Sequence, residues 1–214
     1  MTKPLLQVAL DIEDTQQAIE QLNFIADQVD IIEVGTILAV SQGLNAVRAI
    51  RRHFPHHLIV FDVKITDASR MLAQMAFRAG ANWITVSAAA HIETIRAAQS
   101  VAKEHNGEVQ IELYGHWTWQ DVQQWKAMGI EQVIYHRSRD AELAGLDWSQ
   151  ADLDCLERLR SYGMQVSITG GITPDSLSLF KHLDVKAFIA GRALLADDGL
   201  RHADAFHHNI QLHW

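Results

Sequence analysis

The strongest constraint on the fold of this chain is a short apolar run that recurs eight times along the sequence. Most of the runs are rich in β-branched residues, and each ends at a polar residue or a glycine. Such runs are typical of parallel strands that are buried on both faces. They cover residues 6–11, 29–33, 58–62, 83–87, 109–112, 132–136, 165–169 and 185–191.

Stretches with helical spacing separate these runs. Their apolar residues recur every three or four positions, and we interpret each stripe as a helix face that packs against the core. The stripes are Ala18, Leu22, Ile25 and Val29; Ala68, Met71, Leu72 and Met75; Ile92, Ile95 and Ala98; and Leu153, Leu156, Leu159 and Tyr162.

Strand and helix alternating eight times predict the α/β class and a (β/α)8 TIM barrel, with residues 1–214 as one domain. Each unit then has about 27 residues, which is compact for a fold that typically has ~250. The alternative is a doubly wound open sheet, which usually stops at about five or six strands. Helical crossovers make the strands parallel in either case.

Composition excludes several classes of function. With 18 Lys and Arg against 26 Asp and Glu, the net charge of −8 argues against a nucleic-acid partner. No apolar run approaches the ~20 residues of a membrane-spanning helix, and the N-terminal run is too short for a signal peptide. Cys155 is the only cysteine, so we expect a reducing, cytoplasmic location. The sequence has 12 His, and seven of them show no zinc-site spacing and are interpreted as surface residues: His53, His56, His57, His202, His207, His208 and His213.

In a barrel of this kind, active sites lie at the carboxyl ends of the strands. Any one polar residue there is better explained as a simple strand end, but the charges at eight converging ends need partners. The residues at these ends are Asp11, Glu33, Asp62 with Lys64, Ser87, Glu112, His136 with Arg139, Thr169 with Gly170 and Gly171, and Gly191 with Arg192.

The segment from Asp62 to Asp67 holds the densest group of charges. At strand spacing, Asp62 and Lys64 point the same way, into the barrel mouth. Carboxylates on either side keep Lys64 protonated, which suits the stabilisation of an oxyanion better than Schiff-base chemistry. A structural ion pair is the alternative. We expect Asp67 to cap the following helix.

Glu33 and Asp62 end consecutive strands, and their hard oxygen ligands suit Mg²⁺. The alternative is a pair of solvated carboxylates. The turns Thr169-Gly170-Gly171 and Gly191-Arg192 predict a phosphate cradle, because glycine lets backbone N–H groups approach an anion. A helix is expected to begin near residue 174. The alternative is that these glycines serve tight turns alone.

His136 is a natural proton carrier near neutral pH, although a hydrogen-bonded structural histidine is an equal alternative. Arg137 should point away from His136, whereas Arg139 can turn back over the mouth. A metal, a charged lysine, an acid–base histidine and a phosphate clamp together suit a reaction through the enediolate of a sugar phosphate.

The element Asp62-x-Lys64-x-x-Asp67 resembles the signature of the orotidine-5′-monophosphate decarboxylase superfamily. Within this superfamily, Glu112, Arg139 and Thr169 make the chain more similar to the 3-keto-L-gulonate-6-phosphate decarboxylase family than to the hexulose-6-phosphate synthases. Further matching blocks are residues 6–11, 29–36, 110–113, 117–119, 135–140, 169–171 and 188–192. His91 stands where relatives carry an acidic residue, and we assign it no role.

The resemblance implies a homodimeric barrel that uses Mg²⁺, held by Glu33 and Asp62. It implies that Lys64 stabilises the enediolate and that Asp67 reaches into the partner's site. Further implied roles are substrate contacts by Asp11, orientation by Glu112, protonation through His136 and Arg139, and binding of substrate and its phosphate by Thr169, Gly170, Gly171, Gly191 and Arg192.

The expected reaction is decarboxylation of 3-keto-L-gulonate 6-phosphate to L-xylulose 5-phosphate. The alternatives are aldol addition of formaldehyde to ribulose 5-phosphate, as in hexulose-6-phosphate synthase, and a non-catalytic sugar-phosphate sensor. In each case the expected partner is a small phosphorylated molecule.

Overall fold

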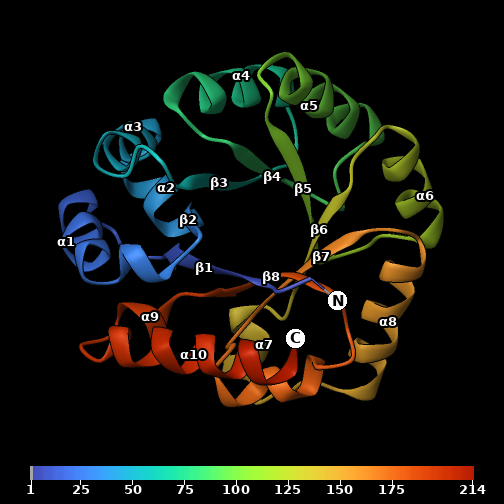
Figure 1. Ribbon diagram of the computed structural model, residues 1–214. Helices are drawn as coiled ribbons and strands as arrows, with labels where there is room; N and C mark the ends of the chain where they lie inside the picture. Colours follow the sequence, from blue (N-terminus) through green and yellow to red (C-terminus); the bar gives the residue numbers. More distant parts are fainter. Residues whose placement is uncertain (1) are drawn as a thin grey trace.

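Eight parallel strands close into a barrel in which each strand pairs with the next along the chain and β8 pairs with β1 (Figure 1). The computed structural model describes residues 2–214. The expected (β/α)8 barrel is therefore confirmed, and the open sheet is excluded. The strands are β1 (Leu5–Leu10), β2 (Ile31–Val34), β3 (Leu58–Ile65), β4 (Trp83–Ser87), β5 (Glu108–Leu113), β6 (Gln132–His136), β7 (Gln165–Thr169) and β8 (Val185–Ala190).

Helices surround the barrel, as the outer ring of coils in Figure 1 shows. Several begin at a side-chain cap; Thr118 with Asp121 and Ser149 with Asp152 form capping boxes that start α6 and α8. The helices are α1 (Thr15–Ile25), α2 (Thr36–Gln42), α3 (Leu44–His53), α4 (Ser69–Ala79), α5 (Ile92–Glu104), α6 (Trp119–Ala127), α7 (Arg139–Leu143), α8 (Gln150–Ser161), α9 (Arg192–Leu195) and α10 (Gly199–His213), with 3₁₀ turns η1 (Ala26–Gln28) and η2 (Asp175–Phe180).

The main core lies between the barrel and its ring of helices. Strand residues such as Val8 and Ile84 pack there against helix residues such as Leu22 and Ala98, and all four are completely buried. Burial of this layer provides the main driving force for folding. Closure of the sheet brings the carboxyl ends of all eight strands to one mouth.

One predicted core stripe is wrong. In α4 the side chains of Met71, Leu72 and Met75 are 66%, 40% and 45% exposed, and the buried face of the helix is formed by residues such as Ala73 and Ala76. Helical spacing identifies an apolar face but does not say what covers it.

Two local predictions also differ from the structure. Asp67 does not cap α4, because the cap position is taken by Ala68 in a left-handed conformation with φ 51° and without a side-chain hydrogen bond. The helix expected near residue 174 is the 3₁₀ turn η2, which follows Pro174. As expected, the carboxyl ends of the eight parallel strands lie together at the mouth.

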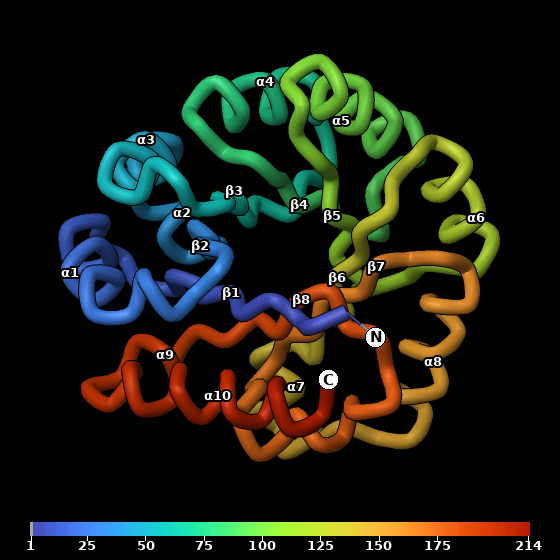
Figure 2. The backbone as a smooth tube through the Cα atoms, in the orientation of Figure 1, coloured from blue at the N-terminus to red at the C-terminus, as the bar shows by residue number. Residues whose placement is uncertain are grey.

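Both ends of the described chain meet the same turn before β8, and Figure 2 shows them close together. The backbone N–H of Thr2 donates to Asp184 at 3.1 Å, and the indole of Trp214 donates to the carbonyl of Leu183 at 2.7 Å. Among residues 2–214, the helices are all too short or too polar to cross a bilayer.

Candidate active site

Lys64 lies near the carboxyl end of β3, at the mouth, with its ammonium group between two carboxylates. Its Nζ pairs with Asp62, lies 3.3 Å from Oε2 of Glu112 and donates to Oγ1 of Thr36 at 2.6 Å. Burial alone would lower the pKa of Lys64, but Asp62 and Glu112 outweigh burial and raise the pKa above its usual value. The side chain is therefore a fixed cation at neutral pH.

A bulge in β3 determines the direction of the Lys64 side chain. The register between β3 and β4 shifts between Phe61 and Ile65, and Lys64 has φ 46°, in the left-handed region. Oγ1 of Thr85 accepts from the Lys64 backbone N–H at 2.9 Å and donates to Asp62 at 2.7 Å. One buried hydroxyl thus fixes both the bulge and the carboxylate.

Asp62 and Glu33 are both buried, but their environments differ. Burial would raise the pKa of Asp62, yet Lys64 and the hydroxyls of Thr85 and Thr36 outweigh burial and lower the pKa. Glu33 has a pKa raised well above its usual value, first by burial and then by repulsion from Asp62. The amide of Gln7 donates to Glu33. The site therefore carries more negative charge than Lys64 balances.

This excess of negative charge fits a divalent cation. Glu33 and Asp62 offer only oxygen atoms, as Mg²⁺ requires, and a cation beside them would offset the repulsion that raises the pKa of Glu33. Within residues 2–214 no cluster of three or more His, Cys, Asp or Glu has the arrangement of a complete metal cage. Magnesium commonly takes one or two carboxylates and fills its other positions with water and substrate oxygens.

Glu112 connects Lys64 to His136. Its Oε2 faces Lys64, and its Oε1 pairs with Nδ1 of His136. Burial is the main cause that raises the pKa of Glu112, and its contacts with His136 and Lys64 act in the opposite direction. Because Nδ1 is anchored by the carboxylate, Nε2 is the ring nitrogen left for a substrate.

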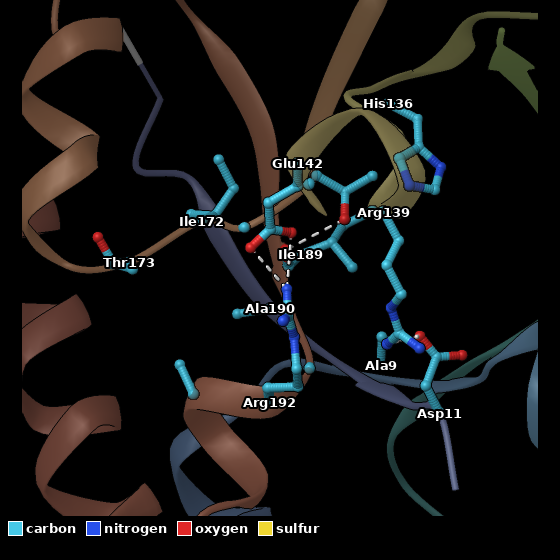
Figure 3. Close-up of a pocket in the computed structure, with 15 residues that line it drawn as sticks. Ala9, Asp11, His136, Arg139, Glu142, Ile172, Thr173, Ile189, Ala190 and Arg192 are labelled. Atoms are coloured by element: carbon cyan, nitrogen blue, oxygen red, sulfur yellow. Dashed lines mark hydrogen bonds and ion pairs between the residues drawn. The ribbon is translucent and has the colours of Figure 1, made fainter. Parts of the chain in front are cut away.

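Next to this charged cluster lies an open pocket of about 240 Å³ (Figure 3). The ends of β1, β6, β7 and β8 and the short helix α7 line it. Of the residues predicted from the sequence, it contains Asp11, His136, Arg139, Thr169, Gly170, Gly171, Gly191 and Arg192.

The two arginines of the pocket are each paired with a carboxylate. Nη2 of Arg139 lies 3.3 Å from Asp11, so Arg139 turns back over the mouth as expected. Nη2 of Arg192 donates to both carboxylate oxygens of Glu142, at 2.8 and 2.6 Å. Figure 3 shows the pair of Arg139 and Asp11 to the right of the pair of Arg192 and Glu142.

The structure thus gathers the predicted residues into two adjoining groups. Glu33, Asp62, Lys64 and Glu112 form the buried charged cluster, and His136 joins it to the pocket through Glu112. Asp67 lies in neither group: it is exposed in the turn between β3 and α4. Arg137 points away from His136, toward Asp147 and the face of Trp148.

Sequence reasoning missed three residues of the site. Thr36 follows β2 and could have been found by its strand-end position. Thr85 lies inside β4 and Glu142 lies in α7, and no local pattern distinguishes either of them from ordinary strand or helix residues. Only the folded chain brings them to the mouth.

Comparison with known proteins identifies close relatives. The profile of the orotidine 5′-phosphate decarboxylase / HUMPS family matches residues 4–204. The probable 3-keto-L-gulonate-6-phosphate decarboxylase of Haemophilus influenzae is 51% identical, with both chains fully covered. A 3-keto-L-gulonate-6-phosphate decarboxylase of Salmonella paratyphi B is 47% identical, again over the full length of both.

Comparison with solved structures also finds 3-keto-L-gulonate-6-phosphate decarboxylases. The 3-keto-L-gulonate-6-phosphate decarboxylase of Vibrio cholerae is 51% identical with a TM-score of 0.95, and the Streptococcus mutans protein in complex with a phosphorylated sugar is 41% identical with a TM-score of 0.97. Each alignment covers 100% of both chains. The 3-hexulose-6-phosphate synthase of Salmonella typhimurium is more distant, at 28% identity and a TM-score of 0.91 over 98% of this chain and 100% of that one.

Proposed function

The chain belongs to the orotidine 5′-phosphate decarboxylase / HUMPS family and is a carboxy-lyase, and we propose that it converts 3-keto-L-gulonate 6-phosphate to L-xylulose 5-phosphate and CO₂. The observation that carries this proposal is the ammonium group of Lys64, held charged between Asp62 and Glu112 beside a pocket that contains two arginines. The names of the full-length relatives support the substrate, and the ligand complex of the Streptococcus mutans protein supports a phosphorylated sugar.

Loss of CO₂ from this β-keto acid leaves an electron pair that delocalises onto the neighbouring carbonyl oxygen, giving a cis-enediolate. Lys64 stabilises this negative charge, because its own charge is already fixed before the reaction begins. We propose that Glu33 and Asp62 hold Mg²⁺ as the cofactor. When bound, the ion adds positive charge that offsets the developing negative charge on the substrate oxygens.

The enediolate must then take a proton at carbon. We propose that His136, anchored through Nδ1 by Glu112, and Arg139, held at the mouth by Asp11, place the water or acid that delivers it. Asp11 would contact substrate hydroxyls, and Glu112 would keep Lys64 and His136 aligned. The turns at Thr169, Gly170 and Gly171 and at Gly191 with Arg192 would bind the substrate and its phosphate.

We also propose that the protein acts as a homodimer through α4. The exposed residues Met71, Leu72 and Met75 form an apolar stripe, and such a stripe on a solvent-facing surface is best covered by another subunit. Asp67 lies two residues before the first residue of this helix and is exposed. A partner seated on the stripe would bring Asp67 close to the neighbouring mouth, where it would take part in the reaction.

The proposal is tested by a paired assay with purified protein and Mg²⁺. We expect CO₂ release from 3-keto-L-gulonate 6-phosphate, and little condensation of formaldehyde with ribulose 5-phosphate. Faster condensation than decarboxylation would make the protein a synthase. Binding of the sugar acid phosphate without any turnover would instead indicate a sensor.

A further inference from the structure

Glu142 is an acidic side chain of the pocket that the proposed reaction does not use. It lies in α7, a helix of five residues that contributes no buried side chain. Figure 3 shows its carboxylate pointing across the pocket to Arg192. Both of its oxygens accept from Nη2 of Arg192, at 2.8 and 2.6 Å.

The same carboxylate also lies against the glycine turn that follows β7. Gly171 has φ 63°, and a Cβ added there would stand 2.9 Å from Cδ and from Oε1 of Glu142. The guanidinium of Arg137 comes even closer to that Cβ position. Arg137 pairs with Asp147, so the Glu142 carboxylate lies beside a glycine turn and is bound by one guanidinium group, that of Arg192, which is the environment expected of a bound anion.

We propose that Glu142 is an internal anion that occupies the phosphate subsite of the free protein, and that the substrate phosphate must displace it from Arg192. This inference rests on the proposed function, in which Arg192 and Gly171 hold that phosphate. Glu142 is thus a residue that sets the affinity and selectivity of the subsite without touching the reacting carbon atoms.

Electrostatics favour the exchange. Glu142 takes up Nη2 of Arg192, and a phosphate bound to the same guanidinium group would repel the carboxylate at a few ångströms, which favours its departure. Glu142 can leave readily, because α7 has no buried side chain to hold it. The doubly charged phosphate gains more from Arg192 than a carboxylate does, so the exchange favours phosphate over singly charged anions.

The experiment measures binding of inorganic phosphate to the full-length protein by isothermal titration calorimetry. Glu142→Gln keeps the size of the side chain and removes its charge, and we expect it to bind phosphate about three- to tenfold more tightly than the wild type. Asp140→Asn is the matched control, because Asp140 is an exposed carboxylate of the same helix that forms no ion pair with any of residues 2–214. It should change the affinity by less than about twofold.

Unchanged or weaker phosphate binding by Glu142→Gln would overturn the inference, and would mean that Glu142 serves only to hold α7 in place. If that variant does not fold, Glu142→Ala provides the same test. Arg192→Ala separates this inference from the proposed function. If phosphate binding does not depend on Arg192, or if neither the wild type nor Glu142→Gln binds phosphate, the phosphate site itself is wrong and both proposals fail.

Discussion

At the scale of single residues, the mouth concentrates charges that are unfavourable for the stability of the free protein. Glu33 is the clearest case, because burial and repulsion from Asp62 both disfavour its ionised form. Residues that serve binding or catalysis commonly reduce stability in this way. The cost can be measured by removing the charge without changing the shape of the side chain.

We expect Glu33→Gln to increase the free energy of unfolding of the metal-free protein by about 1 kcal/mol near pH 8. A raised folded-state pKa means that the folded protein takes up a proton before the unfolded chain does. Wild-type stability therefore rises, relative to that of the variant, as the pH falls through the folded-state pKa. The difference between the two proteins should close toward pH 5.

Urea denaturation in the presence of a chelator, at pH 8 and at pH 5, measures this difference. Glu157→Gln is the control, since Glu157 is exposed on α8. Added Mg²⁺ should stabilise the wild type but not Glu33→Gln. A variant that is less stable at pH 8, or that is stabilised by Mg²⁺ as strongly as the wild type, would contradict the assignment of Glu33.

Most residues of the mouth could be predicted from the sequence, because each strand is visible as an apolar run and the polar residue that ends the run marks the mouth. The pair formed by Asp62 and Lys64 follows directly from that rule. The pair formed by Arg192 and Glu142 does not, because it joins segments 50 residues apart through the return of α7 over the pocket. Such a contact depends on tertiary structure alone.

At the scale of elements, the strands were predictable because fully buried parallel strands have an unmistakable composition. The stripe of α4 was misassigned for a physical reason: an apolar helix face has the same spacing whether the core or another subunit covers it. The bulge in β3 was not predicted either, because a left-handed lysine leaves no signal in the sequence.

The bulge in β3 leads to a prediction about Thr85, which is completely buried. Thr85→Val keeps the shape of the side chain but removes the hydroxyl that bonds Lys64 and Asp62. We expect it to lower the free energy of unfolding by about 1–3 kcal/mol and to reduce kcat, because the backbone N–H of Lys64 in the bulge loses its hydrogen-bond acceptor.

Denaturation and steady-state kinetics test this expectation. Thr94→Val is the matched control, because Thr94 lies in α5 and its hydroxyl forms no hydrogen bond within the described chain; it should shift stability by less than about 0.5 kcal/mol. If Thr85→Val retained full kcat and stability, the hydroxyl would have no part in fixing Lys64.

At the scale of the whole molecule, the proposed dimer predicts that each active site needs residues from two subunits. Lys64→Ala and Asp67→Ala should each reduce kcat by about 100-fold or more, since each removes a group proposed to act on the substrate. When the two variants are mixed and allowed to exchange subunits, one site of each mixed dimer regains both residues. Activity should then recover toward a fraction of the wild-type value.

Size-exclusion chromatography with light scattering shows whether the variants are dimers, and native mass spectrometry detects the mixed dimer by its intermediate mass. Lys181→Ala serves as an active control because Lys181 is exposed beyond η2. Failure of the mixed variants to regain activity, with dimers present, would show that Asp67 acts within its own subunit or not at all. A protein that remains monomeric would remove the role proposed for the stripe on α4.

Closure of the barrel has a consequence for biosynthesis. β1 pairs with β8, so Leu5 meets Ala187 and Val8 meets Ala190. On the ribosome, the first strand leaves the exit tunnel long before this neighbour has been translated, and until then one of its edges remains open to other chains. Asp11 and Arg192 therefore come to face one pocket only after nearly the whole polypeptide has been made, and premature termination before β8 begins at Val185 would yield a sheet with two exposed edges.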